Sequence, residues 1–176
     1  PKNLKTFLAE YLPQDLTQKE FKQKIISFVN GNSNCFESKH PPVRGSESEN
    51  EVGHITGSAW VLSPNKKEVL LTHHKKLNKW LQLGGHSDGE SNVILTALRE
   101  AKEESGIENI KVISEAIFDV DIHSFPQKNN IEAHLHYDIR FCLHAQESLF
   151  SVSEESHDLK WTPLSEITDK FFEESI

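Results

Sequence analysis

A strict alternation of apolar and polar residues from Ile131 to Leu143 constrains the fold of this 176-residue chain more than any other feature. Successive side chains of a β-strand point to opposite faces of a sheet, so the alternation predicts a long strand with two unlike faces. A stretch from Phe118 to His123 alternates in the same way, and we expect longer strands over residues 111–124 and 131–144. The polar positions of the two stretches are Asp119, Asp121, His123, Glu132, His134, His136, Asp138, Arg140 and Cys142.

Two helices are predicted before these strands. Apolar residues recur at three- and four-residue spacing from Asn3 to Leu12, as they do on one face of a helix. The segment Thr17–Glu20 has the capping-box pattern and is expected to open a second helix that stops at Gly31. Residues 31–53 are rich in Ser, Asn, Pro and Glu, lack periodicity, and are interpreted as a linker or a long ordered loop.

Short strands follow this loop. Residues 56–62 and 68–74 flank a Ser-Pro-Asn-Lys turn and predict a hairpin. We expect further short strands at 80–83 and 159–161, and a closing helix from Leu164 onward. Helices that alternate with strands in this order indicate an α/β fold in which helices cover a sheet.

Composition excludes some classes of partner. The formal net charge is −8, which would repel the phosphates of a nucleic-acid polymer or an anionic membrane surface. No apolar run approaches the roughly 18 residues that a membrane helix needs, and we expect a cytoplasmic protein. Its two cysteines are far apart, so a disulfide framework or a zinc ribbon is not expected. A small phosphorylated substrate remains compatible with the charge, because bound divalent cations invert the local field.

A third helix, expected from Ser91 or Asn92 to about Ser105, carries chemistry on one side. Its apolar stripe would pack on the sheet, whereas Glu100, Glu103 and Glu104 share the opposite face at i, i+3 and i+4 spacing. Like charges at this spacing destabilise a helix unless a cation neutralises them. Carboxylate clusters suit magnesium or manganese. The alternative interpretation is a solvated acidic surface.

The residues around this helix resemble a known motif. Gly84 and Gly85 precede it, and adjacent glycines let backbone amides approach a phosphate near a helix N-terminus. The segment from Gly85 to Ile107 resembles the Nudix box, G-x5-E-x7-R-E-U-x-E-E-x-G-U, in which U is aliphatic. Its second half matches throughout if Ala101 counts as U. The first glutamate is missing, because Ser91 occupies its position and Glu90 lies one residue early.

The resemblance implies a Nudix-like α/β/α sandwich with a mixed β-sheet, preceded by an N-terminal helical extension. We expect the extension and linker to span residues 1–45 and the hydrolase domain to span residues 46–176. The implied activity is metal-dependent hydrolysis of a nucleoside diphosphate linked to another group, with water attacking phosphorus. Mg²⁺ is the implied cofactor, with Mn²⁺ as the alternative. The expected partner is a small nucleotide-like molecule, and the assembly, a homodimer included, is left open.

Roles follow for individual residues. Glu100, Glu103 and Glu104 are the implied catalytic metal ligands, and Glu155 is a further candidate ligand. We expect Arg99 to point away from Glu103 and to orient the loop or a glutamate through an ion pair. Ser91 is expected to act only as a helix cap. The candidate substrate-binding residues are Gly84, Gly85, His86, His134, His136 and Arg140. For the strand residues among them the alternative is a solvated or salt-bridged sheet face, and for His86 it is a loop-orienting hydrogen bond.

Two other functions remain open at this point. A Nudix-like protein that has lost catalysis would bind a nucleotide ligand, although the intact glutamate cluster argues against such a loss. An isopentenyl diphosphate isomerase resembles this chain in the same loop, but its essential cysteine would fall on Gly84. Turnover of a nucleotide panel with magnesium separates these alternatives from a hydrolase.

Overall fold

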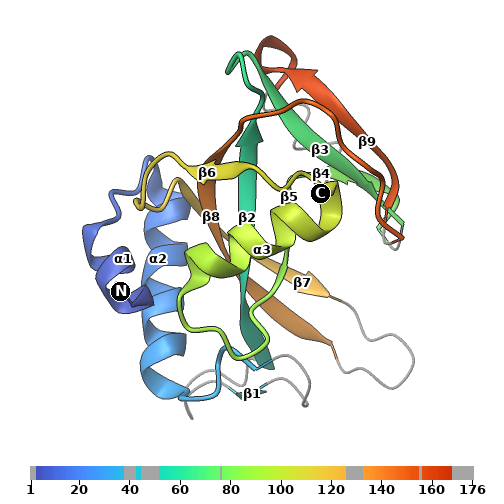
Figure 1. The fold of residues 1–176 in the computed structure, drawn as a ribbon. Helices are drawn as coiled ribbons and strands as arrows, with labels where there is room; N and C mark the ends of the chain where they lie inside the picture. Colours follow the sequence, from blue (N-terminus) through green and yellow to red (C-terminus); the bar gives the residue numbers. More distant parts are fainter. Residues whose placement is uncertain are drawn as a thin grey trace.

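A mixed sheet forms the centre of the computed structural model (Figure 1). The structure describes residues 3–37, 43–44, 52–75, 77–125, 133–154 and 156–167, with only the backbone described at 43–44. Nine strands in this part of the chain form one sheet. Five of them lie in the order β4-β3-β2-β8-β6, and the other four pair with members of this path. The strands are β1 (Val43–Arg44), β2 (Val52–Leu62), β3 (Glu68–His74), β4 (Lys79–Leu81), β5 (Leu83–His86), β6 (Ile110–Val112), β7 (Asp119–Phe125), β8 (His134–Ala145) and β9 (Ser156–Pro163).

The long strands β2 and β8 are parallel neighbours, in register from Gly53 opposite Leu135 to Leu62 opposite His144. The strands β1, β3 and β5 pair antiparallel with β2, while β6 and β7 pair antiparallel with β8. The predicted hairpin is confirmed by the pairing of β2 with β3. This combination of parallel and antiparallel pairs confirms the predicted α/β class with a mixed sheet.

Three α-helices lie in the described chain: α1 (Leu4–Glu10), α2 (Leu16–Gly31) and α3 (Val93–Ser105). The predicted N-terminal helices are therefore present, but the cap of α2 was predicted wrongly. Asp15 occupies the N-cap, and its side chain accepts a hydrogen bond from the Gln18 backbone N–H, so the helix begins before Thr17. Asp15 binds an amide of the first helical turn in the way expected of Thr17, but two residues earlier in the chain.

All three helices share one hydrophobic core with the odd-numbered side of β2 and β8. Ile55 and Ala59 of β2 and Ile139 of β8 are fully buried in it. The even-numbered side is polar toward β7 and β8. Near β3 this side carries a small apolar cluster built from Trp60, Val69 and Leu71. The long alternation in the sequence thus separates an apolar core from a polar face.

Four predicted segments differ from the structure. The candidate strand 111–124 is divided into β6 and β7 by irregular chain, and the candidate strand 80–83 is divided into β4 and β5 at Gln82. The candidate linker 31–53 contains β1 and the first residues of β2. The predicted closing helix begins as a 3-10 turn, Leu164–Glu166, and residues 168–176 lie outside the described part.

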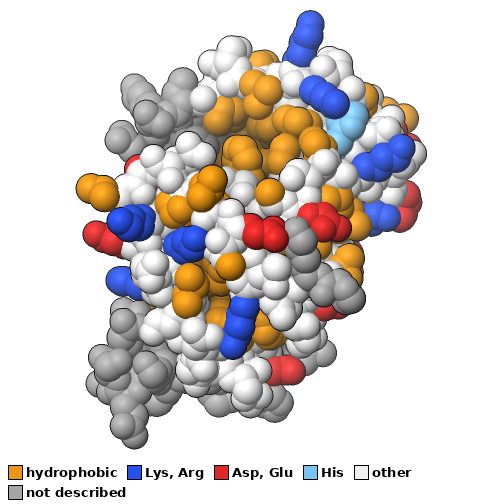
Figure 2. Space-filling model, turned by 90° about the vertical axis from the view of Figure 1, so that its left-hand side faces the viewer, with side chains coloured by type: hydrophobic (Ala, Val, Ile, Leu, Met, Phe, Trp, Pro, Cys, Tyr) orange, Lys and Arg blue, Asp and Glu red, His pale blue; other side chains and the backbone are white. Residues whose placement is uncertain are grey.

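The surface seen from the side of α1 and α2 is mixed. Figure 2 shows apolar side chains gathered in its upper half, with basic and acidic side chains interspersed around them. None of the described helices is both long and apolar enough to cross a membrane.

Replacement of Phe28 by alanine is expected to lower the free energy of unfolding by about 3–5 kcal/mol. The Phe28 ring is 3% exposed and stacks on Tyr137 of β8 with 4.1 Å between ring centroids, so its loss leaves a cavity between α2 and the sheet. Urea unfolding measures the change. Leu16→Ala is the control on the same helix, because Leu16 is 77% exposed. Equal stability of the two variants would show that α2 does not pack on the sheet as described.

Candidate active site

Helix α3 lies directly on β2 because β2 has a glycine where the two elements cross. A Cβ atom added to Gly57 would lie 2.8 Å from the Val93 carbonyl oxygen and 3.0 Å from the Thr96 side chain. The apolar stripe of α3 is buried at Val93, Ala97 and Ala101. The acidic face of the helix is thereby brought beside β5, which pairs with β2.

The paired glycines of β5 accommodate two carboxylates of the candidate site. Glu104 is 6% exposed, and its Oε2 accepts a hydrogen bond of 3.1 Å from the Gly84 backbone N–H. A Cβ atom added to Gly85 would lie 2.5 Å from Oε2 of Glu100, so this carboxylate occupies the space that a side chain would fill. The glycines therefore hold Glu100 and Glu104 against the strand.

Arg99 joins the remaining glutamate to this arrangement. Its Nη1 lies 2.6 Å from Oε1 of Glu100 and 3.0 Å from Oε2 of Glu103, and its Nη2 donates a 2.6 Å hydrogen bond to the His86 carbonyl oxygen. Burial lowers the pKa of Arg99, but Glu100 and Glu103 outweigh this effect and raise it. The expectation that Arg99 points away from Glu103 was wrong, because one guanidinium reaches both glutamates and the loop.

The loop before α3 is closed by Glu90 rather than by Ser91. Oε1 of Glu90 accepts a 2.7 Å hydrogen bond from the Asn92 backbone N–H. Asn92 occupies the N-cap and makes no side-chain cap hydrogen bond. The sequence left Ser91 and Asn92 open as caps, so the N-cap at Asn92 agrees with one of the two, and Ser91 does not cap the helix. Glu90, one residue early for the box pattern, stabilises the start of the helix.

Oxygen donors of this kind fit a hard divalent cation. Glu100 and Glu104 are fixed by β5, and Glu103, with 60% of its side chain exposed, faces solvent beside them. Carboxylates are the ligands that Mg²⁺ and Mn²⁺ prefer. The other predicted ligand, Glu155, lies outside the described residues.

The even-numbered face of β8 places Arg140 among three aspartates. Its Nε, Nη1 and Nη2 lie 2.9, 2.9 and 2.6 Å from carboxylate oxygens of Asp138, Asp119 and Asp121. Burial would raise the pKa of Asp121, but hydrogen bonding from His123 and the charge of Arg140 lower it to about 2. Asp138 is 1% exposed and also accepts hydrogen bonds from the Thr56 and Ser58 hydroxyls. The guanidinium is thus directed toward the sheet face, and its predicted phosphate contact stays a prediction.

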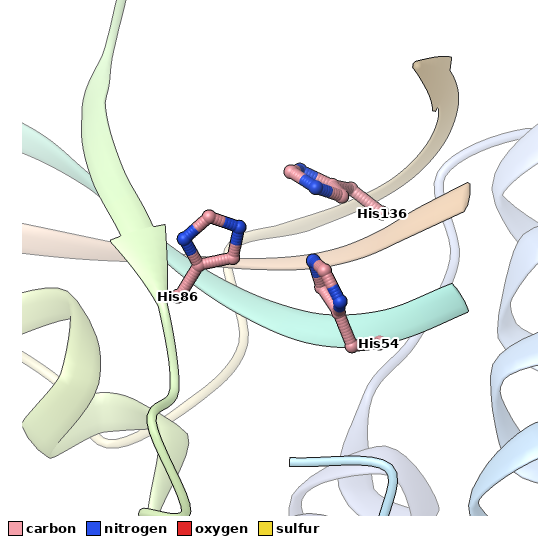
Figure 3. Close-up of side chains that lie close together, drawn as sticks. All are labelled: His54, His86 and His136. Carbon is pink, nitrogen blue, oxygen red and sulfur yellow. The ribbon is translucent and has the colours of Figure 1, made fainter. Parts of the chain in front are cut away.

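Histidines fill the same face next to this ion-pair network. The structure brings the predicted residues His86, His134 and His136 together and adds His54, which sequence reasoning missed. Figure 3 shows three of these side chains, His54, His86 and His136. Ring centroids of His54 lie 4.8 Å from His86 and 4.5 Å from His136. His54 is opposite His136 in the parallel pair of β2 and β8, and that pairing has no local sequence signal.

Burial governs the ionisation of this cluster. It lowers the pKa of His54 from 6.5 to about 3, and the neighbouring His86 and His134 act in the same direction. Burial also lowers the pKa of His136, together with His54, His123 and His86. Both rings are therefore neutral at pH 7, and each has a nitrogen lone pair.

We expect a fall in pH to lower the stability of the metal-free protein at pH values above the ordinary pKa values of carboxylates. Between pH 6.5 and 4.5 the unfolded chain binds a proton at residue 54, whereas folded His54 does not, so stability falls as the pH falls. His54 alone accounts for about 2–3 kcal/mol over this interval. Urea unfolding in chelator at both pH values measures the loss. The His54→Gln variant should lose less than wild type, and His144→Gln, outside the cluster, should lose as much. An equal loss in His54→Gln would contradict the assignment.

Known proteins identify the family. The NUDIX domain model matches residues 54–175, which is more than half of the chain. No curated protein matches this chain. Among solved structures, a NUDIX-family hydrolase from Clostridium perfringens is 27% identical, with 62% of this chain and 81% of that chain covered and a TM-score of 0.45. RenU, a Nudix hydrolase from M. smegmatis, is 17% identical, with 66% and 74% covered and a TM-score of 0.48.

The family assignment rests on the domain match, which contains every residue of the box. It begins at residue 54, inside β2, so α1 and α2 precede it. The predicted boundary between residues 45 and 46 stays a prediction. With the box glutamates on α3 and the paired glycines on β5 inside the matched region, this chain belongs to the NUDIX family.

Proposed function

We propose that this protein hydrolyses the diphosphate linkage of a nucleoside diphosphate derivative, with water attacking phosphorus and Mg²⁺ as cofactor. NUDIX membership supports a diphosphohydrolase as the enzyme class. The observation that carries the finer proposal is the fixation of Glu100 and Glu104 on β5 by two glycines. Carboxylates held in this way lose little conformational entropy when they bind a cation.

Glu100, Glu103 and Glu104 would hold the ion. When bound, a divalent cation lowers the pKa of water and neutralises charge on the diphosphate. The protein contributes the position of these carboxylates: the Gly84 amide orients Glu104, and Arg99 orients Glu100 and Glu103. Arg99 also donates to the His86 carbonyl, so the same guanidinium links Glu100 and Glu103 to the end of β5. We assign Arg99 a positioning role in the site.

The substrate is proposed to approach over the end of β5 and the polar face of β8. Gly84 and Gly85 contact Glu104 and Glu100, and the same strand ends at His86, whose ring lies with His134 and His136 on the even-numbered face of the sheet. Arg140 lies further along this face of β8. Glu155 as a ligand, Mn²⁺ as a substitute and a cytoplasmic location remain parts of the proposal. Which nucleotide and which leaving group the enzyme accepts is to be measured.

The test is hydrolysis of a panel of nucleoside diphosphate derivatives by the full chain in Mg²⁺, followed by chromatography. Saturable release of a nucleoside monophosphate from at least one member is the expected result. Tight binding across the panel without turnover would contradict the proposal and favour a ligand-binding protein. Reaction in ¹⁸O water should place the label on a phosphate product, and label elsewhere would exclude attack at phosphorus.

A further inference from the structure

Three histidines from three strands point their rings toward one another on the polar face of the sheet (Figure 3). His54 comes from β2, His86 from the end of β5 and His136 from β8. One ring nitrogen from each lies within 4.8 Å of the other two. Among the described residues, no other group of three histidine, cysteine, aspartate or glutamate side chains comes this close. The box glutamates, of which Glu100 and Glu103 meet through Arg99, do not form such a group.

The spacing of the rings is that of imidazoles around one small cation. In a tetrahedral zinc site with Zn–N distances near 2.0–2.1 Å, two ligand nitrogens lie about 3.3 Å apart and two ring centroids about 5 Å apart. The three centroid distances here are 4.8, 4.5 and 5.2 Å. The rings are already at the required separation, so rotation of the side chains would bring the nitrogens into range without movement of the strands.

His54 provides an independent indication of a missing ligand. Its side chain is 4% exposed, and within the described part of the chain neither Nδ1 nor Nε2 has a hydrogen-bond partner. A buried polar group left unpaired is costly, so native structures rarely keep one without a role. A cation bound by one of these nitrogens would compensate this cost. A purely structural histidine would be expected to donate to a carbonyl or a carboxylate instead.

The neighbours of the three rings fit a metal site. Nε2 of His134 lies 3.2 Å from Nε2 of His136, and metal-bound histidines are often oriented by such a partner on the other side. The Phe125 ring lies 4.1 Å from His136 and covers it with apolar surface.

We propose that His54, His86 and His136 bind one zinc ion, at a site distinct from the carboxylates of the box. Imidazole ligands favour zinc and related transition metals, whereas carboxylates favour magnesium, so the two sites select different metals. Three protein ligands leave one position for water or another oxygen ligand, as in zinc sites that bind substrate. His86 follows Gly85 directly in β5, and successive strand residues face opposite sides of the sheet, so this ion would lie on the face away from Glu100.

Zinc binding to the full chain tests the site. Wild type is stripped with chelator, incubated with Zn²⁺ in excess Mg²⁺, desalted, and analysed for metal content and thermal unfolding. We expect about one equivalent of zinc and, at a free zinc concentration a hundredfold above Kd, a rise in Tm of about 5–11 °C. Less than a tenth of an equivalent in wild type, or no change in Tm, would overturn the proposal.

Variants locate the ion. His86→Gln and His136→Gln should lose the zinc and the rise in Tm. His144→Gln, on the same strand as His136, should keep both. Because His86 is exposed, its replacement is not expected to prevent folding if that of His136 does. Glu104→Gln should retain zinc although it loses hydrolysis, which separates this proposal from the proposed function. Loss of zinc in Glu104→Gln, or its retention in His86→Gln, would assign the ion elsewhere and overturn the proposal.

Discussion

Replacement of Glu104 by glutamine is expected to lower kcat by about a hundredfold or more. Removal of one preorganised electrostatic group from an active site typically costs 10²–10³ in kcat. Glutamine has the same shape and can still accept the 3.1 Å hydrogen bond from Gly84 through its amide oxygen, so the change removes charge and little else. Steady-state kinetics in Mg²⁺, with the best substrate of the panel, measures the effect.

Two further variants make this result interpretable. Glu103→Gln is expected to fall by a comparable factor, because Glu103 belongs to the same proposed ligand set. Glu108→Gln is the control, since Glu108 is exposed and lies beyond the end of α3. Rates near wild type for both Glu103→Gln and Glu104→Gln would place the metal site elsewhere in the protein.

Replacement of Arg140 by methionine is expected to lower the free energy of unfolding by about 3–5 kcal/mol. The guanidinium is 13% exposed and is the shared partner of Asp119, Asp121 and Asp138, which would otherwise repel one another. Burial lowers its pKa, but the three carboxylates outweigh burial and raise it above the ordinary range. Urea unfolding at pH 7 measures the change. Lys111→Met, at an exposed position of the neighbouring β6, should change stability by less than about 0.5 kcal/mol.

The phosphate-binding hypothesis for Arg140 makes a different prediction. If the side chain contacts substrate, Arg140→Lys should raise KM more than it lowers kcat, because an ammonium cannot reproduce the planar fork. If it only holds the three aspartates, the same substitution should lower stability and leave KM unchanged. Measuring both quantities on one variant distinguishes binding from scaffolding.

The sequence predicts those parts of the site that depend on local spacing. Three glutamates at helical spacing predict the acidic face of α3, and alternation predicts that His134, His136 and Arg140 share a face of β8. Both expectations follow from the geometry of a single element, and the structure shows the second. On α3 Glu103 is exposed, whereas Glu104 is buried on the side of Ala97 and Ala101, so the three glutamates do not all lie opposite the apolar stripe. The paired glycines also precede the helix as expected, although the structure places carboxylates against them.

Contacts between distant segments could not be predicted in this way. His54 meets His136 because β2 and β8 are parallel neighbours, and no local pattern specifies which strands pair. Asp138 and Arg140 meet Asp119 and Asp121 through the register of β7 on β8. Glu90 accepts a hydrogen bond from the Asn92 amide before the first turn of α3, a contact that the capping pattern does not predict. Each of these contacts depends on tertiary structure.

The metal dependence of hydrolysis tests the central claim most directly. The rate at saturating substrate is measured in excess chelator and then during titration with Mg²⁺, for wild type and for Glu104→Gln. Three carboxylates that act through a bound cation predict no turnover in chelator, recovery of the wild-type rate with Mg²⁺, and a variant that stays at least about a hundredfold slower at saturating Mg²⁺. Full wild-type hydrolysis in excess chelator would contradict the account.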